Sequence, residues 1–243
     1  MALDELIMKI RLDKYLADMS IGTRSEVKKL ISKGAVTVNG EKVKKPETKI
    51  DTDADSVVCL GEDVSYAEYE YYMLNKPQGV ISATEDVNQS TVLDLIDSKR
   101  KDLFPVGRLD KDTEGLLLIT NDGHLCHDLL APGKHVDKVY YAKIDGVVTD
   151  KDVKAFLEGL DIGDDKPALP GYLKILKSDE ISEIELTIHE GRFHQVKRMF
   201  KAVDKEVIFL KRLSMGNLVL DPSLKPGEYK ELKKDEITRY VKQ

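Results

Sequence analysis

The run Gly115–Thr120 (GLLLIT) constrains the fold more than any other stretch of this chain. It is a short, continuous apolar segment, and the turn-forming residues Asn121, Asp122 and Gly123 follow it directly. A short apolar run bounded by such residues is typical of a buried strand. The sequence therefore predicts a sheet that contains this strand, with a tight turn after it.

Several further strands are expected in the same part of the chain. Alternating or apolar segments predict them at residues 69–74, 138–144, 172–176, 183–189 and 206–213. Apolar residues at helical spacing predict helices at residues 91–96, 124–130, 151–159 and 194–202. Because these strands and helices do not alternate regularly, an α+β domain with a mixed or antiparallel sheet is favoured over a doubly wound parallel sheet.

The first sixty residues have a different pattern. Apolar residues recur at helical spacing in 10–16 and again in 27–31, which predicts two helices. Residues 35–43 read as two short strands around an Asn39-Gly40 hairpin turn, and a further strand is expected at 56–60. The sequence therefore predicts a small α/β domain at 8–60, an acidic linker at 61–68 and a larger domain at 69–243.

The net charge of −6 hides a strong local asymmetry. Residues 9–49 contain eleven lysines and arginines and five acids, whereas residues 51–72 contain seven acids and no base. Residues 189–213 contain seven bases and three acids. Two basic segments separated by an acidic one are typical of a protein that meets a polyanion with particular faces. Two solvated helix faces would explain the same counts equally well.

Several classes of protein and site are excluded. No apolar run approaches the roughly 18 residues of a membrane span, and acids stand near the N-terminus where a signal peptide would carry bases. Cys59 and Cys126 are too few for a disulfide framework or a four-cysteine zinc site, so we interpret them as packing residues of a cytoplasmic protein. His124 and His127 lack a third metal ligand. The sequence also has no phosphate-binding loop and no signature of a serine or cysteine nucleophile.

Two loops carry side chains that could do chemistry. Residues 105–115 (PVGRLDKDTEG) place Arg108, Asp110 and Asp112 in a glycine-bounded loop directly before the buried strand. Asp110 beside Arg108 could be a nucleophile or a base, or the acids could merely satisfy backbone groups of a turn. Residues 190–200 (EGRFHQVKRMF) supply donors at a loop-to-helix junction, and they also fit an ordinary amphipathic helix.

Taken in order, these segments resemble one family, the ribosomal pseudouridine synthases that carry an N-terminal S4 RNA-binding domain. Residues 10–60 resemble the S4 domain. The family's catalytic-domain motifs are similar to residues 76–79 (KPQG), 107–115 (GRLDKDTEG), 138–140 (KVY), 190–200 and 213–220. The His-Gln-Val-Lys form at 194–197 most resembles the branch that modifies uridine 516 of small-subunit 16S rRNA. Met1–Ile7 has no counterpart in the family.

The resemblance implies an isomerisation of uridine that needs no cofactor and no metal. The N1–C1′ bond is broken, the uracil rotates, and the base is rejoined through C5. Asp110 would attack C1′ or C6, and Lys197 would pair with Asp110, keep it ionised and aim it. Tyr140 would stack on the uracil and help to remove the C5 proton. Arg108 would fill the gap left by the flipped uridine or hold a phosphate.

The resemblance also implies how the RNA is bound. The expected partner is 16S rRNA or a small-subunit assembly intermediate, and the protein is expected to act as a monomer. It would recognise the phosphates and the shape of the RNA more than the RNA sequence. The expected RNA-binding residues are Arg11, Lys14, Arg24, Lys28 and Lys29 in the first domain and Arg192, His194 and Arg198 in the second. Val196 and Leu213 are expected to line the uridine pocket.

Three alternatives remain open at this point. They are a catalytically silent RNA-binding assembly factor, a synthase that acts on a uridine of 23S rRNA, and a glycosidase that releases uracil to water. The presence of Asp110, Tyr140 and Lys197 argues against the first, because a silent relative has no need of that trio. No evident second carboxylate pairs with Asp110 to activate water, which argues against the third.

Overall fold

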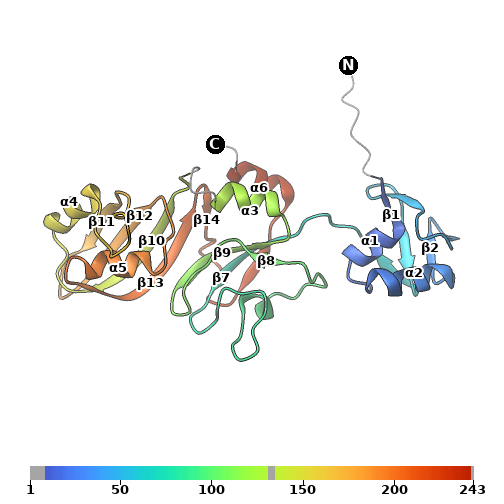
Figure 1. Cartoon of the computed structure of the whole chain (residues 1–243), viewed down its shortest axis with the longest axis horizontal. Helices are drawn as coiled ribbons and strands as arrows, with labels where there is room; N and C mark the ends of the chain where they lie inside the picture. Colours follow the sequence, from blue (N-terminus) through green and yellow to red (C-terminus); the bar gives the residue numbers. More distant parts are fainter. Residues whose placement is uncertain (1–8, 131–134, 242–243) are drawn as a thin grey trace, which may run out of the picture. The chain divides into compact units, whose positions relative to one another are not determined.

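The computed structural model describes residues 9–130 and 135–241, and its contacts divide the chain into two compact units (Figure 1). The first unit holds the residues up to Glu68 together with Asp97–Asp102, and the second holds Tyr69–Ile96 and the chain from Leu103 onward. Met1–Ile7 lies outside the described residues. Each unit has a hydrophobic core of its own.

The first unit combines two helices with two small antiparallel sheets. Its helices are α1 (Leu12–Asp18) and α2 (Arg24–Ser32). Its strands are β1 (Lys9–Arg11), β2 (Val36–Val38), β3 (Glu41–Lys42), β4 (Lys49–Asp51), β5 (Val57–Cys59) and β6 (Glu62–Val64). β1 pairs with β4, and the other sheet has the order β3-β2-β5-β6. Apolar residues of both helices pack against these strands in one core, as their spacing predicted.

Local chemistry sets the ends of these elements. α2 begins at a capping box, in which the Glu26 backbone N–H donates to Thr23 Oγ1 (3.3 Å) and the Thr23 N–H donates to the Glu26 carboxylate (2.8 Å). Asn39 and Gly40 have φ angles of 50° and 83°, the left-handed conformation that a tight two-residue hairpin requires. The predicted hairpin is therefore confirmed.

Two features of the first unit differ from expectation. Residues 62–64 form β6, which pairs antiparallel with β5, so the segment 61–68 is in part a strand rather than a linker. The reason is the buried Val64, which packs into the core after two exposed acids. Arg11, expected on the first helix, is instead the last residue of β1 and immediately precedes α1.

The second unit is built on one mixed sheet of nine described strands. The main path has the order β11-β12-β10-β13-β9-β7-β15, with β8 paired to β9 and β14 paired to β13. The strands are β7 (Tyr71–Lys76), β8 (Phe104–Pro105), β9 (Glu114–Thr120), β10 (Lys138–Asp145), β11 (Tyr172–Lys177), β12 (Ile181–Ile188), β13 (Glu206–Met215), β14 (Leu218–Val219) and β15 (Tyr229–Glu231). β13 and β9 run parallel, whereas the other pairs are antiparallel. The predicted α+β class with a mixed sheet is confirmed.

Helices pack against this sheet in two groups. They are η1 (Val92–Leu95, a 3-10 helix), α3 (Gly123–Leu130), α4 (Asp150–Glu158), α5 (Gln195–Lys201) and α6 (Lys234–Val241). Apolar residues of η1, α4 and α5 share one core, and those of α3 and α6 share a second. Figure 1 shows α3 and α6 near one another and α5 on the β10–β13 part of the sheet. β9 lies between β13 and β7, and Gly115–Thr120 is buried throughout, as predicted.

Close strand contact fixes the start of β9. A Cβ atom at Gly115, whose φ is 105°, would lie 2.2 Å from the backbone oxygen of Arg212 on β13. Only glycine permits this approach. The loop that precedes β9, with Asp110 and Asp112, is therefore anchored at the centre of the sheet.

The expected elements of the second unit hold with one change of type. Apart from the helix predicted at 91–96, the predicted helices agree with the structure to within one residue at each end. The predicted strands agree to within two residues at each end. Residues 91–96 were expected to form an α-helix, but only the 3-10 helix η1 forms there. β8, β15 and α6 were not expected, and the two strands have only two or three residues, too short a pattern to read.

Candidate active site

The loop that carries Asp110 is held through its main chain. Ser82 is buried, and its hydroxyl donates to Leu109 O (2.9 Å) and accepts from the Leu109 N–H (3.0 Å). The Gly79 N–H donates to Lys111 O (2.8 Å), and the Thr113 N–H donates to Asp110 O (3.1 Å). Because the residues on both sides of Asp110 are fixed, its side chain is presented from a rigid support at 27% exposure.

Lys76, the last residue of β7, lies beneath this loop with its side chain completely buried. Its amine donates to Pro77 O (2.9 Å) and Thr113 O (2.9 Å) and lies 3.4 Å from Lys111 O. Burial lowers the pKa of Lys76 to about 8, although the charges of Asp112, Asp110 and Glu114 oppose this shift. Lys76 therefore ties the end of β7 to the loop that precedes β9.

Sequence reasoning assigned Lys76 no individual role, although it noted the segment 76–79. A usable signal was present. Lys76 is the last residue of a largely apolar strand and stands directly before a proline. At this position a lysine that faced solvent would mark the end of the buried strand. A buried lysine has to find acceptors, and three carbonyls supply them here.

Replacing Lys76 by Met should change how stability depends on pH. In the folded protein the pKa of Lys76 is about 8, against an ordinary value of 10.5. Between these values the unfolded chain binds the proton more strongly, so the free energy of unfolding rises with pH. From pH 8 to pH 10 the unchanged protein should gain about 2 kcal/mol relative to Lys76→Met. Urea unfolding of both proteins at the two pH values measures this, and parallel pH dependences would contradict the assignment.

Lys197, from α5, meets the carboxylates of the loop. Its Nζ lies 3.3 Å from Asp110 Oδ2, so the predicted pairing of Lys197 with Asp110 is present in the structure. Asp112 is closer still, since its two oxygens accept from Lys197 Nζ at 2.6 and 2.8 Å. The interpretation of Asp112 as a residue of the turn alone is therefore incomplete. The Asp112 side chain is 67% exposed, so this shorter contact contributes little stability.

The charges at this site reinforce one another. Burial by itself would lower the pKa of Lys197, but the hydrogen bond with Asp112 and the charge of Asp110 raise it overall. Burial likewise would raise the pKa of Asp112, and the bond and charge of Lys197 hold it below its usual range. Lys197 therefore stays protonated at neutral pH, as a cation beside the Asp110 carboxylate.

His194 brings a second side-chain nitrogen close to the Asp110 carboxylate. Its Nε2 lies 3.6 Å from Asp110 Oδ1, and the residue has a left-handed backbone with φ of 48° directly before α5. Side chains other than glycine rarely adopt this conformation, and it often marks functional sites. His194 was expected to bind RNA, whereas the structure places it beside Asp110.

Arg192 and Arg198 make contacts within the protein that were not expected. Arg192 donates to Lys166 O (2.6 Å), Pro167 O (2.9 Å) and the Glu190 carboxylate (2.9 Å). Arg198 donates to Ile162 O (2.9 Å), and its guanidinium also pairs with Asp164. Both were expected to contact RNA, but here their guanidinium groups anchor the segment between α4 and β11. The physical reason is that these carbonyls have no strand partner and need donors.

The remaining predicted site residues fall into three environments. Tyr140 on β10 is 7% exposed and shares one buried cluster with Leu109 and Val196. Leu213 is half-buried and does not belong to that cluster. Arg108 is exposed, next to Leu109 in the loop. The structure thus brings Tyr140 and Val196 into the core that borders Asp110, whereas Leu213 stays outside it.

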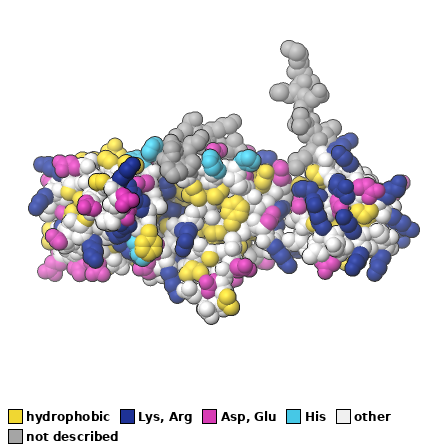
Figure 2. Space-filling view, viewed as in Figure 1, with side chains coloured by type: hydrophobic (Ala, Val, Ile, Leu, Met, Phe, Trp, Pro, Cys, Tyr) yellow, Lys and Arg dark blue, Asp and Glu magenta, His cyan; other side chains and the backbone are white. Residues whose placement is uncertain are grey.

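Some of the predicted RNA-binding residues of the first unit lie near acids of the same unit, and others are exposed on α2. Arg11 donates to both carboxylate oxygens of Asp13 (2.9 and 2.8 Å), and Lys14 pairs with Asp18 (2.5 Å). Lys28 lies 4.0 Å from Asp13. Arg24 and Lys29 are exposed on α2. Figure 2 shows lysine and arginine side chains spread over the visible face of this unit, where phosphates could reach them.

Within 9–130 and 135–241, no three histidine, cysteine or acidic side chains converge as they would around a metal ion, and this includes His124 and His127. Burial raises the pKa of the Cys59 and Cys126 thiols, which suits packing residues rather than nucleophiles. No helix in the described part of the chain could cross a bilayer.

Comparison with known proteins gives matches over both units. The S4 domain family matches residues 10–56, and the RNA pseudouridylate synthase family matches residues 70–202. An uncharacterized RNA pseudouridine synthase of Bacillus subtilis is 48% identical over 94% of this chain and 97% of its own. Ribosomal small subunit pseudouridine synthase A of Haemophilus influenzae is 39% identical, over 96% of this chain and 100% of its own.

Two further relatives complete the comparison. Ribosomal large subunit pseudouridine synthase B of Bacillus subtilis is 38% identical over 94% of both chains. A crystal structure of a pseudouridylate synthase superimposes with a TM-score of 0.67 at 38% identity, covering 96% of this chain and 99% of that one. With the Asp110 loop, its lysine partner and an S4 domain ahead of them, the chain belongs to the RNA pseudouridylate synthase family, whose members are isomerases.

Proposed function

We propose that this protein converts uridine 516 of 16S rRNA into pseudouridine, with Asp110 as its nucleophile. The observation that carries the proposal is the position of Asp110, on a loop fixed through its main chain and beside Lys197 Nζ at 3.3 Å. The family supplies the reaction type. The Haemophilus influenzae relative, which is named for the small subunit, supports the choice of target.

The reaction needs a nucleophile that can form and release a bond to the nucleoside. A carboxylate oxygen of Asp110 attacks C1′ of the ribose or adds to C6 of the ring. The N1–C1′ bond breaks, its electron pair stays on the uracil, and the base turns so that C5 faces the sugar. A C5–C1′ bond then forms, Asp110 is released, and the proton on C5 leaves while N1 gains one. Lys197 orients the Asp110 carboxylate throughout.

Tyr140 is proposed as the stacking surface for the base. It belongs to the same buried cluster as Leu109 and Val196, so its ring has apolar support next to the Asp110 loop. A flat aromatic ring can hold the free uracil while it turns and so limit its loss to solvent. The Tyr140 phenol is also proposed to help remove the C5 proton, directly or through a water molecule.

The position of Asp112 changes one argument against a glycosidase. A second carboxylate does share Lys197 with Asp110, although no local pattern in the sequence indicated it. What supports isomerisation over hydrolysis is therefore the match to the synthase family rather than the lack of a second acid. The same match, together with Asp110 and Lys197, also supports an active enzyme over a silent binding factor.

One experiment separates these functions. The protein is incubated with a 16S rRNA fragment that carries tritium at C5 of its uridines, and released tritium and free uracil are both measured. The proposed reaction releases tritium and no uracil, hydrolysis releases uracil, and binding alone releases neither. Mapping of pseudouridine in whole 16S and 23S rRNA then decides the target. Modification of 23S rRNA alone would overturn the small-subunit assignment, for which the large-subunit relative provides the rival.

The first unit is proposed to supply affinity for rRNA or a small-subunit assembly intermediate, in the cytoplasm and as a monomer. Arg24 and Lys29 are two of its exposed α2 bases. Changing both to Glu should weaken binding of the 16S fragment. The slope of log affinity against log salt should become shallower, by roughly 0.7 to 0.9 for each phosphate that the variant no longer neutralises.

A matched control keeps this test specific. Lys154 is an exposed lysine on α4, which belongs to the second unit, and Lys154→Glu makes the same kind of charge change outside the first unit. Its salt slope should equal that of the unchanged protein. If the double variant also keeps the original slope, α2 does not contact the RNA backbone.

A further inference from the structure

Phe193 is the most exposed aromatic side chain among the residues of the second unit that the structure describes, with 77% of its surface accessible. A single exposed apolar residue ordinarily needs no explanation. Here, however, its ring stacks on the His194 ring, with centroids 3.8 Å apart and planes 16° from parallel. The other edge of His194 reaches Asp110 Oδ1 at 3.6 Å. Phe193 is therefore separated from the nucleophile by one ring.

The backbone under Phe193 is fixed by buried polar contacts. Gln195 is 4% exposed, and its side-chain oxygen accepts from the Arg192 N–H (2.9 Å) while its amide donates to Glu190 (2.8 Å). Arg198 donates to Phe193 O (3.0 Å). Phe193 thus stands on a rigid loop, with its outer face open.

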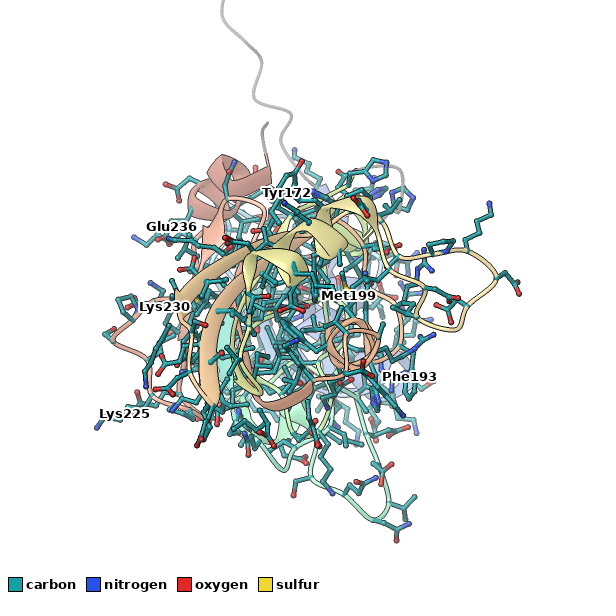
Figure 3. The ribbon with its side chains drawn as sticks, turned by 90° about the vertical axis from the view of Figure 1, so that its left-hand side faces the viewer. Tyr172, Phe193, Met199, Lys225, Lys230 and Glu236 are labelled. Atoms are coloured by element: carbon teal, nitrogen blue, oxygen red, sulfur yellow. The ribbon has the colours of Figure 1, made fainter. Side chains whose placement is uncertain are left out.

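The position of Phe193 in the fold also leaves its outer face open. Figure 3 labels Met199 of α5 within the body of the unit and Phe193 at its margin, although both belong to the same loop and helix. Met199 is fully buried, and its packing explains why α5 docks on the sheet. No comparable packing explains Phe193 among the described residues, because its only ring contact there is with His194.

We propose that Phe193, backed by His194, is a stacking platform for the nucleobase next to the uridine that enters the active site. This inference rests on the proposed reaction with RNA. When a uridine leaves its stack, the neighbouring base loses a partner, and an exposed aromatic ring can replace it. The left-handed backbone of His194 turns the ring pair toward Asp110, so the platform and the nucleophile are presented together.

The chain contains no tryptophan, so Phe193→Trp introduces a single fluorescent reporter at this position. Stacking of a base on that indole should quench its emission when the 16S fragment is added. Tyr172→Trp is the matched control, because Tyr172 is also an exposed aromatic, and Figure 3 labels it at a different margin of the same unit. Its emission should change little. Equal emission of the Phe193→Trp variant with and without RNA would overturn the proposal.

Substitutions separate stacking from simple apolar cover. Phe193→Ala should weaken binding of the fragment about 5- to 150-fold. Phe193→Leu keeps an apolar cover over His194 but has no aromatic face, so it should bind as weakly as the Ala variant. Phe193→Tyr should bind like the unchanged protein. If Leu restores binding as well as Tyr does, the ring only covers His194 and the stacking proposal is wrong.

The outcomes also distinguish this proposal from the proposed function. Thermal unfolding of each variant confirms that the exposed position leaves the fold intact. If the unchanged protein releases no tritium, the proposed function fails, whatever Phe193 does in the binding and emission measurements. If it releases tritium and Phe193→Ala binds normally, the function stands and the platform does not.

Discussion

Asp110→Asn should abolish release of tritium from uridine labelled at C5, while binding of the 16S fragment stays within about tenfold of that of the unchanged protein. An amide has nearly the shape of a carboxylate, but it is a far weaker nucleophile. Loss of a covalent nucleophile typically costs about 10⁴-fold or more in rate. The loop should keep its conformation, because Ser82 and Lys76 hold it through backbone atoms rather than through the Asp110 side chain.

Asp112→Asn is the matched control for this prediction. Both acids lie in one loop and both contact Lys197, so the two variants remove the same charge at neighbouring positions. The Asp112 side chain is 67% exposed, so its pair with Lys197 is worth at most about 1 kcal/mol. Activity should therefore stay within about tenfold. Loss of tritium release in the Asp112 variant alone would reverse the roles of the two acids.

Lys197→Met should leave the protein folded and lower the single-turnover rate by about 10²- to 10³-fold. The methyl thioether fills a similar volume but provides no cation for Asp110, which lies 3.3 Å from Lys197 Nζ. It also removes the cation that Asp112 binds, so both acids of the loop would lose the charge that they share. Quench-flow measurement with saturating 16S fragment isolates this step from binding.

A control on the same helix tests whether the effect belongs to this site. Lys201 is exposed at the end of α5, and Lys201→Met removes one positive charge without touching the loop acids. Its rate should stay within about twofold of that of the unchanged protein. Equal rates for the Lys197 and Lys201 variants would mean that Lys197 is an ordinary solvated helix residue.

The arrangement of the site explains why a single lysine can have so large an effect. Lys197 and His194 approach Asp110 from the N-terminal end of α5, which is docked on the sheet by the buried Val196 and Met199. The carboxylate is fixed from the other side by its own loop. With both parts rigid, the geometry is formed before the substrate arrives, and little reorganisation is needed during the reaction.

Much of the fold follows from local patterns in the sequence. The run Gly115–Thr120 specified β9, the Asn39-Gly40 pair specified the hairpin of the first unit, and helical spacing located α4 and α5 to within a residue. The motif around Asp110 also pointed to the nucleophile candidate. Each of these signals is complete within a few neighbouring residues, because the backbone preferences and the side-chain period that produce it are local.

Other features depended on contacts between distant parts of the chain. The sequence favoured Arg192 and Arg198 as RNA ligands. It did not indicate that both donate hydrogen bonds to backbone carbonyls more than 20 residues away in the chain. It also left Lys76 without a role, although three carbonyls surround its amine. A lysine or arginine looks the same in sequence whether it faces solvent or buried acceptors. Only the tertiary structure decides which acceptors lie within reach.

The site itself shows the same division. The residue types Asp110 and Lys197 were identifiable from the sequence, but the sharing of Lys197 by Asp112 and the approach of His194 to Asp110 were not. Asp112 and Lys197 are 85 positions apart, and no local pattern encodes a contact across that separation. The sequence determined which groups are available for chemistry. The packing of α5 against the sheet decided which of them meet, because burial of its apolar face fixes where its polar side chains point.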